Sequence, residues 1–248
     1  MEDIIRTSSL SVGYDGIPVL QDIDLGIPQG KITVILGTSG SGKTTLMKSL
    51  IGLLPPLGGR VFFAGDEVDY ESEQSLNTLY RRIGVLYQNG ALLNSLTLYH
   101  NIALPIRMLH PATAKEIERE MVFSGLSRVG LEDAWYKFPA ELSGGMRKRA
   151  ALARAMVLDP QVIFCDEPSS GLDPIIATEL DGLLIQMRDL FEATVVVVTH
   201  ELRSIQNIAD RVLVLHGGTQ HFEGSLSQFT QSRDSFISRF LLREGSNV

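Results

Sequence analysis

The segment GTSGSGKT, residues 37–44, constrains the fold of this chain more than any other feature. It follows the apolar run ITVIL and precedes TTLMKSLIGLL, a run that favours a helix. Its spacing matches G-x-x-x-x-G-K-[ST], the pattern of a phosphate-binding loop between a strand and a helix. The glycines let backbone N–H groups curve around an anion at a helix N-terminus, where aligned peptide dipoles favour negative charge. A Gly/Ser-rich turn with a surface lysine is the alternative, but it leaves eight constrained positions unexplained.

The residues of this loop have separate expected roles. Lys43 should reach the β and γ phosphates of a nucleotide, and Thr44 should place its hydroxyl on Mg²⁺. The residues expected to bind the nucleotide here are Gly37, Thr38, Ser39, Gly40, Ser41, Gly42, Lys43, Thr44 and Thr45. The sequence therefore predicts a site for a nucleoside triphosphate and Mg²⁺.

A second apolar run, VIFCDEP at residues 162–168, ends in two adjacent carboxylates. Such a strand end lies near the phosphate loop in P-loop folds, so we expect Asp166 to hold Mg²⁺ and Glu167 to polarise the attacking water as general base. The alternative is an ordinary acidic pair that caps the following turn. Cys165, one residue earlier, is interpreted as a buried strand residue and not as a nucleophile.

Composition and charge exclude several other classes of protein. A chain of 248 residues, 44% of them hydrophobic, can bury one large domain or a core with a smaller inserted lobe. The net charge of −7 argues against nucleic-acid binding, because the basic cluster Arg147-Lys148-Arg149 is too short to reverse it. A single cysteine allows no disulfide within the chain. The start, MEDIIRTSSL, lacks a signal-peptide pattern and no apolar run approaches about 18 residues, so we expect a cytosolic chain that neither is exported nor crosses a membrane.

Strand-like runs occur in two groups. IIRTSSLSV, VLQDIDLGI and RVFFAG, separated by turn residues such as Asp15-Gly16, predict a small antiparallel sheet in the first third of the chain. KITVIL, QVIFC, TVVVVT and RVLVL, several of them separated by helical patterns, predict a mostly parallel sheet covered on both faces. The expected fold is α/β, with a P-loop NTPase core and an N-terminal antiparallel β subdomain.

Helical patterns fill most of the remaining chain. Residues from about Gln88 to Pro139 contain no strong strand, which predicts an inserted helical lobe. The run after Ser143 is rich in helix formers, and another helix should begin at Asp173-Pro174, where an N-cap residue precedes proline. The tail after Gly224 has a roughly helical apolar pattern formed by Leu226, Phe229, Phe236, Ile237, Phe240 and Leu241.

Five motifs in a fixed order make the chain similar to the ATP-binding cassette (ABC) ATPases over roughly residues 4–225. They are GTSGSGKT, LSGGM at 142–146, VIFCDEP, SGLD at 170–173 and VTH at 198–200. The resemblance implies a single ABC ATPase domain over residues 1–248. Within it, residues 1–87 and 146–225 would form the nucleotide-binding core with its β subdomain, residues 88–145 the helical subdomain, and residues 226–248 a C-terminal helical extension.

The resemblance implies further contacts with ATP. In the family, the residues at the positions of Ser143, Gly144 and Gly145 address the ATP of the opposite subunit. A capped helix start with two glycines leaves backbone N–H groups open to a phosphate, which agrees with this role. Asp173 closes the D-loop, which crosses the dimer interface in this family, and it is also a suitable N-cap.

Three more positions match the family one by one. Tyr14 resembles the aromatic residue that stacks on adenine, although a turn aromatic is the alternative. Gln88 resembles the Q-loop glutamine, which senses the γ-phosphate and Mg²⁺. His200 stands where the family has a histidine near the γ-phosphate and the attacking water, whereas His100, His110, His216 and His221 lack that context and are expected in surface or turn positions.

Together these residues form the expected site for ATP and Mg²⁺. The expected catalytic residues are Lys43, Gln88, Glu167 and His200, and the expected Mg²⁺ ligands are Thr44, Gln88 and Asp166. Because each ATP would need the loop of one subunit and Ser143 of the other, the resemblance implies a homodimer that closes over two ATPs. It also implies a membrane permease partner, contacted near Gln88, with the ATPase lying peripherally on the cytoplasmic side of the inner membrane.

Two local features resemble one branch of the family, the ATPases of MCE-associated (Mla-type) lipid transport systems. They are YQNGALLNSLTLYHNIALPIR at the Q-loop and Met146 at the fifth position of LSGGM, the signature segment of the family. Asn89 departs from the small residue associated with its place. This resemblance implies a phospholipid or other hydrophobic cargo and a periplasmic MCE-domain lipid-binding protein. The apolar tail from Phe236 to Leu242 could contact the dimer partner or pack on its own core.

Other functions remain open alternatives. An amino-acid or peptide importer ATPase would share every catalytic residue. A soluble ATPase acting on ribosomes or DNA usually carries two cassettes, whereas this chain has one and is acidic. A GTPase outside the family would need an Asn-Lys-x-Asp segment, which the sequence lacks, and would leave LSGGM unexplained.

Overall fold

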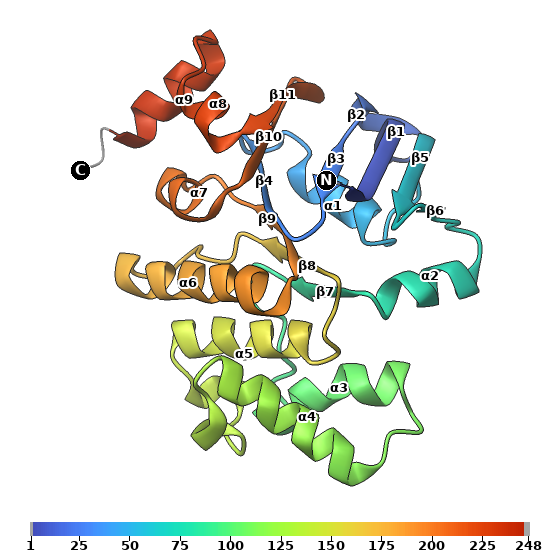
Figure 1. Ribbon diagram of the computed structural model, residues 1–248, viewed down its shortest axis with the longest axis vertical. Helices are drawn as coiled ribbons and strands as arrows, with labels where there is room; N and C mark the ends of the chain where they lie inside the picture. Colours follow the sequence, from blue (N-terminus) through green and yellow to red (C-terminus); the bar gives the residue numbers. More distant parts are fainter. Residues whose placement is uncertain (1, 246–248) are drawn as a thin grey trace. The chain divides into compact units, whose positions relative to one another are not determined.

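The computed structural model describes residues 2–245. The chain divides into two compact units. Unit 1 comprises Met1–Val68 and Val196–Val248, and unit 2 comprises Asp69–Val195. The division falls within the buried strand β9 (Thr194–Val198). Figure 1 gives the labels of the helices and strands used below.

The first part of unit 1 is the expected antiparallel sheet. Its strands are β1 (Asp3–Tyr14), β2 (Ile17–Ile23), β3 (Gly26–Pro28), β5 (Gly58–Phe63) and β6 (Asp66–Glu67). They are ordered β2-β1-β5-β6, and β3 also pairs with β1. Asp15 and Gly16 both have positive φ, 53° and 76°, as a tight two-residue hairpin requires. The predicted Asp15-Gly16 turn is therefore confirmed.

The run VLQDIDLGI is two strands and not the single strand that its pattern predicted. The backbone turns between Ile23 and Gly26, because Asp24 accepts a hydrogen bond from the backbone N–H of Ser9 at 2.7 Å. The buried Thr7 hydroxyl donates to the Ile23 carbonyl (2.7 Å) and accepts from the Leu25 N–H (2.9 Å). These contacts come from residues about fifteen positions away, so the local pattern did not reveal the break.

The second part of unit 1 carries parallel strands. β4 (Ile32–Gly37) pairs in parallel with β10 (Arg211–His216), which pairs antiparallel with β11 (Thr219–Ser225). All six residues of β4 are buried, as expected for a strand covered on both faces. The helices of this part are α1 (Lys43–Leu50), α7 (Leu202–Ile208), α8 (Leu226–Thr230) and α9 (Ser235–Gly245).

The tail packs on unit 1 through two helices, as its apolar pattern predicted. Phe229 on α8 and Ile237 on α9 are almost fully buried, whereas Leu242 is 70% exposed. Asp234 caps α9 by accepting hydrogen bonds from the N–H groups of Phe236 and Ile237. Residues 246–248 of the predicted C-terminal extension lie outside the described residues, and a contact of this tail with a dimer partner stays a prediction.

Unit 2 holds a parallel strand pair and most of the helices. β7 (Ile83–Leu86) runs parallel to β8 (Val162–Asp166), and the register pairs Leu86 with Cys165. The helices are α2 (Glu73–Tyr80), α3 (Leu98–Leu109), α4 (Lys115–Arg128), α5 (Gly144–Met156) and α6 (Pro174–Phe191), with short 3₁₀ turns at Glu132–Ala134 and Pro139–Glu141. Helices α3 and α4 lie where the helical lobe was expected, and both pack on α5 (Figure 1).

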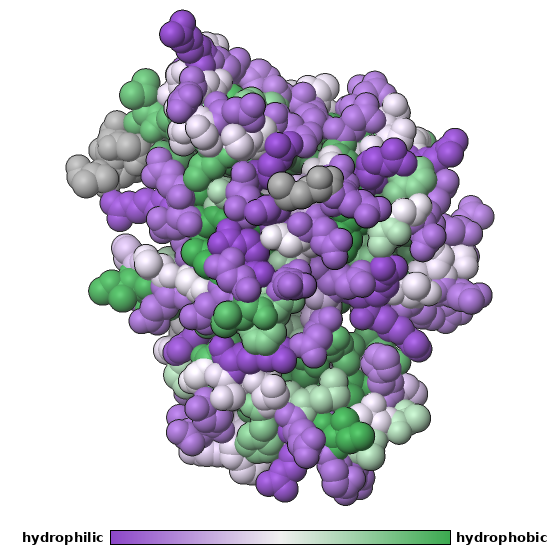
Figure 2. Space-filling model, in the orientation of Figure 1, coloured by the Kyte–Doolittle hydropathy of each residue, from purple (hydrophilic) through white to green (hydrophobic). Residues whose placement is uncertain are grey.

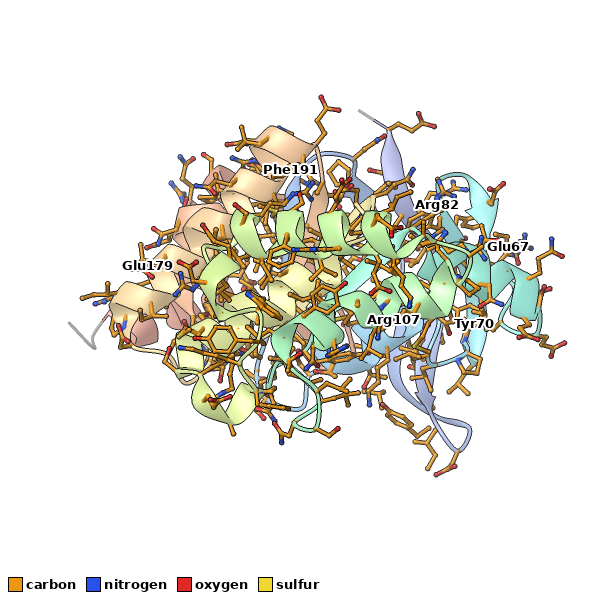
Figure 3. The ribbon with its side chains drawn as sticks, turned by 90° about the horizontal axis from the view of Figure 1, so that it is seen from below. Glu67, Tyr70, Arg82, Arg107, Glu179 and Phe191 are labelled. Atoms are coloured by element: carbon orange, nitrogen blue, oxygen red, sulfur yellow. The ribbon has the colours of Figure 1, made fainter. Side chains whose placement is uncertain are left out.

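An ion pair joins α3 to α4. Arg107 donates two hydrogen bonds to the Glu118 carboxylate, at 2.8 and 2.7 Å, and the Tyr99 hydroxyl donates a third at 3.1 Å. Arg107 is labelled in Figure 3, where these two helices lie in the foreground. Glu118 is 9% exposed. The guanidinium of Arg107 and then the Tyr99 hydroxyl hold the pKa of Glu118 below its usual value.

Substituting Glu118 with glutamine should lower stability in a pH-dependent way. The folded-state pKa of Glu118 is depressed, so its contribution is present above the unfolded pKa of about 4.3 and is lost as pH falls through the folded pKa. We expect Glu118→Gln to cost about 1–2 kcal/mol at pH 7, and this difference should shrink toward pH 3. Urea unfolding at several pH values measures it, with the exposed Glu120→Gln on α4 as control. An undiminished difference at pH 3 would contradict the assignment.

On the face drawn in Figure 2, hydrophilic residues cover most of the area and apolar residues occur in small groups. Such scattered apolar side chains are normal on protein surfaces. Among residues 2–245, the helices are too short or too polar for any of them to span a lipid bilayer.

Candidate functional site

The glycine-rich loop has the predicted strand–loop–helix context. β4 ends at Gly37 and α1 begins at Lys43. Gly40 and Gly42 have positive φ, 78° and 95°, which side-chain-bearing residues rarely adopt. Gly42 is the N-cap of α1, so no side chain caps the first turn, and that turn carries no acidic residue. The N-terminal amides of α1 are therefore suited to an anion.

The loop fits a phosphate for a second reason. The Ser41 hydroxyl oxygen is buried and has no hydrogen-bond partner within the described protein, an arrangement that usually costs free energy. A Cβ on Gly37 would lie 2.2 Å from this oxygen, and a Cβ on Gly42 would lie 2.7 Å from the Leu20 side chain. Both glycines are thus required by close packing, and Ser41 offers a polar group that a ligand oxygen can satisfy.

Lys43 lies folded against the loop that it belongs to. Its ammonium donates to the carbonyls of Gly37 at 2.9 Å and Thr38 at 3.1 Å. Thr38, Ser39, Gly40 and Thr44 are exposed around it, while Thr45 is buried. The cationic group is therefore held within the span of the loop, where a bound phosphate would meet it.

Tyr14 lies beside α1. The residue is 44% exposed, and the Lys48 ammonium lies 5.8 Å from the ring centroid and donates to the hydroxyl at 3.4 Å. A hydrogen bond with Thr45, together with Lys48, lowers the pKa of the Tyr14 hydroxyl. An exposed aromatic ring next to the phosphate loop is available to stack on a flat ligand.

His200 lies two residues beyond the end of β9. The backbone N–H of the preceding residue, Thr199, donates to the Ile35 carbonyl at 3.3 Å, so His200 follows a residue bonded to the strand that leads into the loop. His200 is exposed, as are His100, His110, His216 and His221. The exposure of the last four agrees with their predicted surface positions.

In unit 2, the acidic pair ends a buried strand as predicted. Asp166 is the last residue of β8 and is 9% exposed. Glu167 follows with φ of 47°, a left-handed conformation that is uncommon for residues with a side chain. Cys165 is fully buried, and burial raises the pKa of its thiol to about 12, partly opposed by the charge of Lys148. Its predicted position as a buried strand residue is confirmed.

Gln88 lies two residues beyond the end of β7, the strand that pairs with β8. Its side-chain amide donates to the Ser170 hydroxyl at 3.4 Å. The Q-loop position and the residues after the acidic pair are therefore in contact within unit 2.

The signature segment begins α5. Ser143 is its N-cap and accepts a hydrogen bond from the Met146 N–H at 3.2 Å, which confirms the predicted cap. A Cβ on Gly145 would lie 2.5 Å from the Ile176 side chain, whereas one on Gly144 would lie 3.5 Å from Leu172. Close packing of α5 on α6 thus explains in part why residue 145 is a glycine. Its neighbour Ser143 is exposed at the helix start.

The D-loop ends at the predicted cap of α6. Asp173 accepts hydrogen bonds from the N–H groups of Ile175 at 3.0 Å and Ile176 at 3.1 Å. Pro174 follows as the first helical residue. The cap interpretation is confirmed, and a contact of Asp173 with a nucleotide or a second subunit stays a prediction.

The sequence patterns did not single out Lys148, which lies on α5 five residues after Ser143. It is 7% exposed, and its ammonium donates to the backbone carbonyls of Gln88 and Glu167, the latter at 3.2 Å. Helical spacing places Lys148 in line with Gly145, Leu152 and Met156, all buried. The sequence signal that could have found Lys148 is its position within a stripe of otherwise non-polar residues along one face of the predicted helix.

The predicted site residues therefore fall into two sets. Tyr14, the loop 37–45 and His200 belong to unit 1, whereas Gln88, Ser143, Asp166, Glu167 and Asp173 belong to unit 2. The Thr44 hydroxyl and the Asp166 carboxylate are the hard oxygen ligands that Mg²⁺ prefers. Among the described residues, no group of three or more His, Cys, Asp or Glu side chains is placed to hold a metal ion.

Known proteins match this chain over most of its length. It is 42% identical over 211 residues to "Probable ribonucleotide transport ATP-binding protein mkl" of Mycobacterium tuberculosis, a match that covers 85% of this chain and 58% of the relative. It is 36% identical over 243 residues to "Intermembrane phospholipid transport system ATP-binding protein MlaF" of Haemophilus influenzae, covering 98% and 92%. It is 38% identical over 243 residues to "Methionine import ATP-binding protein MetN" of Mannheimia succiniciproducens, covering 96% and 70%. The chain thus spans little more than half the length of the mycobacterial relative.

Solved structures and a family profile agree with these relatives. cbiO1 of Clostridium perfringens, part of the ABC transporter complex cbiONQ, has a TM-score of 0.85 at 28% identity and covers 99% of this chain and 97% of its own. The dimeric ATP-binding cassette MJ0796 bound to ADP and Pi has a TM-score of 0.81 at 28% identity, covering 90% and 98%. The profile described as "ABC transporter" matches residues 20–170. The chain therefore belongs to the ABC transporter family, as an ATPase cassette with a P-loop NTPase fold.

Proposed function

We propose that the chain is the ATP-hydrolysing subunit of a membrane transporter that moves phospholipid or another hydrophobic cargo between two membranes. The alignment with MlaF carries the lipid part of this proposal, because it extends over 98% of this chain and 92% of that relative. The match with MetN reaches 70% of its length and that with mkl 58%. The segment NGALLNSL after Gln88 and Met146 in the signature support the same assignment.

Each predicted residue would have a defined role toward bound ATP. The loop amides, the Ser41 hydroxyl and Lys43 would hold the phosphates of ATP, and Tyr14 would stack on its base. Thr44 and Asp166, with Gln88, would hold Mg²⁺, which neutralises phosphate charge when bound. Glu167 would accept a proton from the attacking water, which His200 would help to orient.

A homodimer would complete each site. Ser143, Gly144 and Gly145 of one copy would face the phosphates held by the other copy, and Asp173 would lie at the contact between them. ATP would then favour the closed dimer, and hydrolysis would remove contacts that the open dimer lacks. The solved dimeric cassette with ADP and Pi supports this arrangement.

The proposed partner is an integral-membrane permease, with the ATPase bound peripherally on the cytoplasmic side of the inner membrane. A periplasmic MCE-domain lipid-binding protein would complete the system. An amino-acid importer is the second candidate, favoured by the 38% identity to MetN. Both candidates use the same hydrolytic residues, so the cassette chemistry does not separate them.

Copurification separates the two candidates. A tagged Glu167→Gln chain is isolated from gently solubilised membranes of its native cells, and proteins and lipids are identified by mass spectrometry. We expect a permease, an MCE-domain protein and bound phospholipid. A solute-binding protein with an importer permease would overturn the lipid assignment, and recovery of ribosomes or DNA would overturn the transport role. An untagged strain is the control for adventitious membrane protein.

A further inference from the structure

We propose that Lys148 is a positioning residue that fixes the backbone of Glu167 and links it to the Q-loop at Gln88. This inference rests on the proposed function of Glu167 as general base. Its structural part stands on contacts within unit 2 alone. The residue lies on α5, the helix that begins with the signature segment.

The first step is the burial of a charge. Lys148 is 7% exposed, and a buried ammonium is costly unless hydrogen bonds compensate for the lost water. Two of its hydrogen bonds go to the backbone carbonyls of Gln88 and Glu167. These residues are 60 and 19 positions away along the chain, so one ammonium ties together two loops that follow neighbouring strands, β7 and β8.

The second step is the conformation of Glu167. Its φ of 47° is unfavourable for a residue with a side chain and persists only where surrounding contacts hold it. The Glu167 carbonyl accepts hydrogen bonds from the Lys148 ammonium and from the Ser170 N–H, each at 3.2 Å. Because the backbone sets the direction of the Cα–Cβ bond, these bonds constrain where the carboxylate can lie.

The third step separates Lys148 from its neighbour on α5. Arg154 also holds the Q-loop, by donating to the carbonyls of Gly90 at 2.8 Å and Ala91 at 2.7 Å. No hydrogen bond from Arg154 to the Glu167 segment occurs among those found in the described residues. Lys148 thus donates hydrogen bonds both to the Q-loop and to the segment that carries Glu167, whereas Arg154 donates to the Q-loop. A change in the backbone conformation of the Q-loop would accordingly be transmitted to the backbone of Glu167 through Lys148.

Hydrogen exchange of the nucleotide-free protein tests the contact without relying on activity. We expect Lys148→Met to speed amide exchange in both segments 87–91 and 166–171, and Arg154→Met to speed it in 87–91 alone. Lys115→Met, at an exposed site on α4, is the matched control for the lost charge. Unchanged exchange at 166–171 in Lys148→Met would overturn the proposal. If that variant does not fold, Lys148→Gln replaces it with the same comparison, because its shorter, neutral side chain removes the ammonium that joins the two carbonyls.

Steady-state ATP hydrolysis tests the consequence. Misplacing a general base lowers turnover more than binding, so we expect Lys148→Met to lower kcat about tenfold or more while the KM for ATP stays within about threefold. Lys148→Arg, which retains a cation, should recover part of the loss. A rise in KM that matches the fall in kcat, or a wild-type kcat, would overturn the positioning role. If the wild-type chain itself does not hydrolyse ATP, the proposed function fails. The hydrogen-exchange result still shows whether Lys148 holds the two backbone segments.

Discussion

Glu167→Gln should abolish most ATP hydrolysis while ATP binding stays close to wild type. Removing a general base typically costs about 10²- to 10⁴-fold in rate, and we expect kcat to fall within that range. Glutamine has nearly the size of glutamate, and the backbone contacts at Glu167 use its carbonyl, which the substitution retains. Phosphate release measures the rate, and titration with a fluorescent ATP analogue measures the affinity.

Glu179→Gln on α6 is the control, because Glu179 is exposed (labelled in Figure 3) and has no proposed role. It should hydrolyse ATP like the wild type. Wild-type turnover in Glu167→Gln would remove Glu167 as the base. A large loss of ATP affinity in that variant would instead assign Glu167 to binding.

Lys43→Ala should weaken nucleotide binding itself. The ammonium of Lys43 lies within the phosphate loop, held by the carbonyls of Gly37 and Thr38. Hydrogen bonds to a charged group contribute about 1.5–3 kcal/mol, so its loss should lower ATP affinity roughly 10- to 100-fold. Calorimetric titration in the Glu167→Gln background measures binding without turnover.

Lys31→Ala provides the matched control, since Lys31 stands just before β4 and outside the loop. Its affinity for ATP should equal that of the parent protein. Thermal unfolding should show that both alanine variants remain folded. Unchanged affinity in a folded Lys43→Ala protein would contradict the phosphate-binding role of residues 37–45.

Features that depend on the spacing of residues within a short segment could be predicted from the sequence. The loop at 37–45 needs glycines at positions that the backbone itself dictates, and Ser143 and Asp173 cap helices through bonds that span two or three residues. Parallel strands such as β4 and β8 are continuous apolar runs and could be recognised as such. The fold class and the order of the motifs followed from these features.

Features that depend on distant contacts could not be predicted. β7 is four residues long and contains Gly84, where a Cβ would lie 2.0 Å from the Ala155 carbonyl of α5. That glycine weakens the strand pattern, and the reason for it is close packing against Ala155, 71 positions later in the chain. Lys148 was noted only within a short basic cluster, because its partners lie in loops that come together through the pairing of β7 and β8.

The molar mass of the Glu167→Gln chain with saturating ATP and Mg²⁺, measured by light scattering and compared with its mass in ADP, tests the central claim most directly. The claim is that two copies enclose two ATPs, each held by the loop of one copy and Ser143 of the other. The account predicts a dimer with two bound ATPs in ATP and a monomer in ADP, and Ser143→Arg should prevent the dimer without loss of the fold. A monomer that binds one ATP with unchanged mass would contradict it.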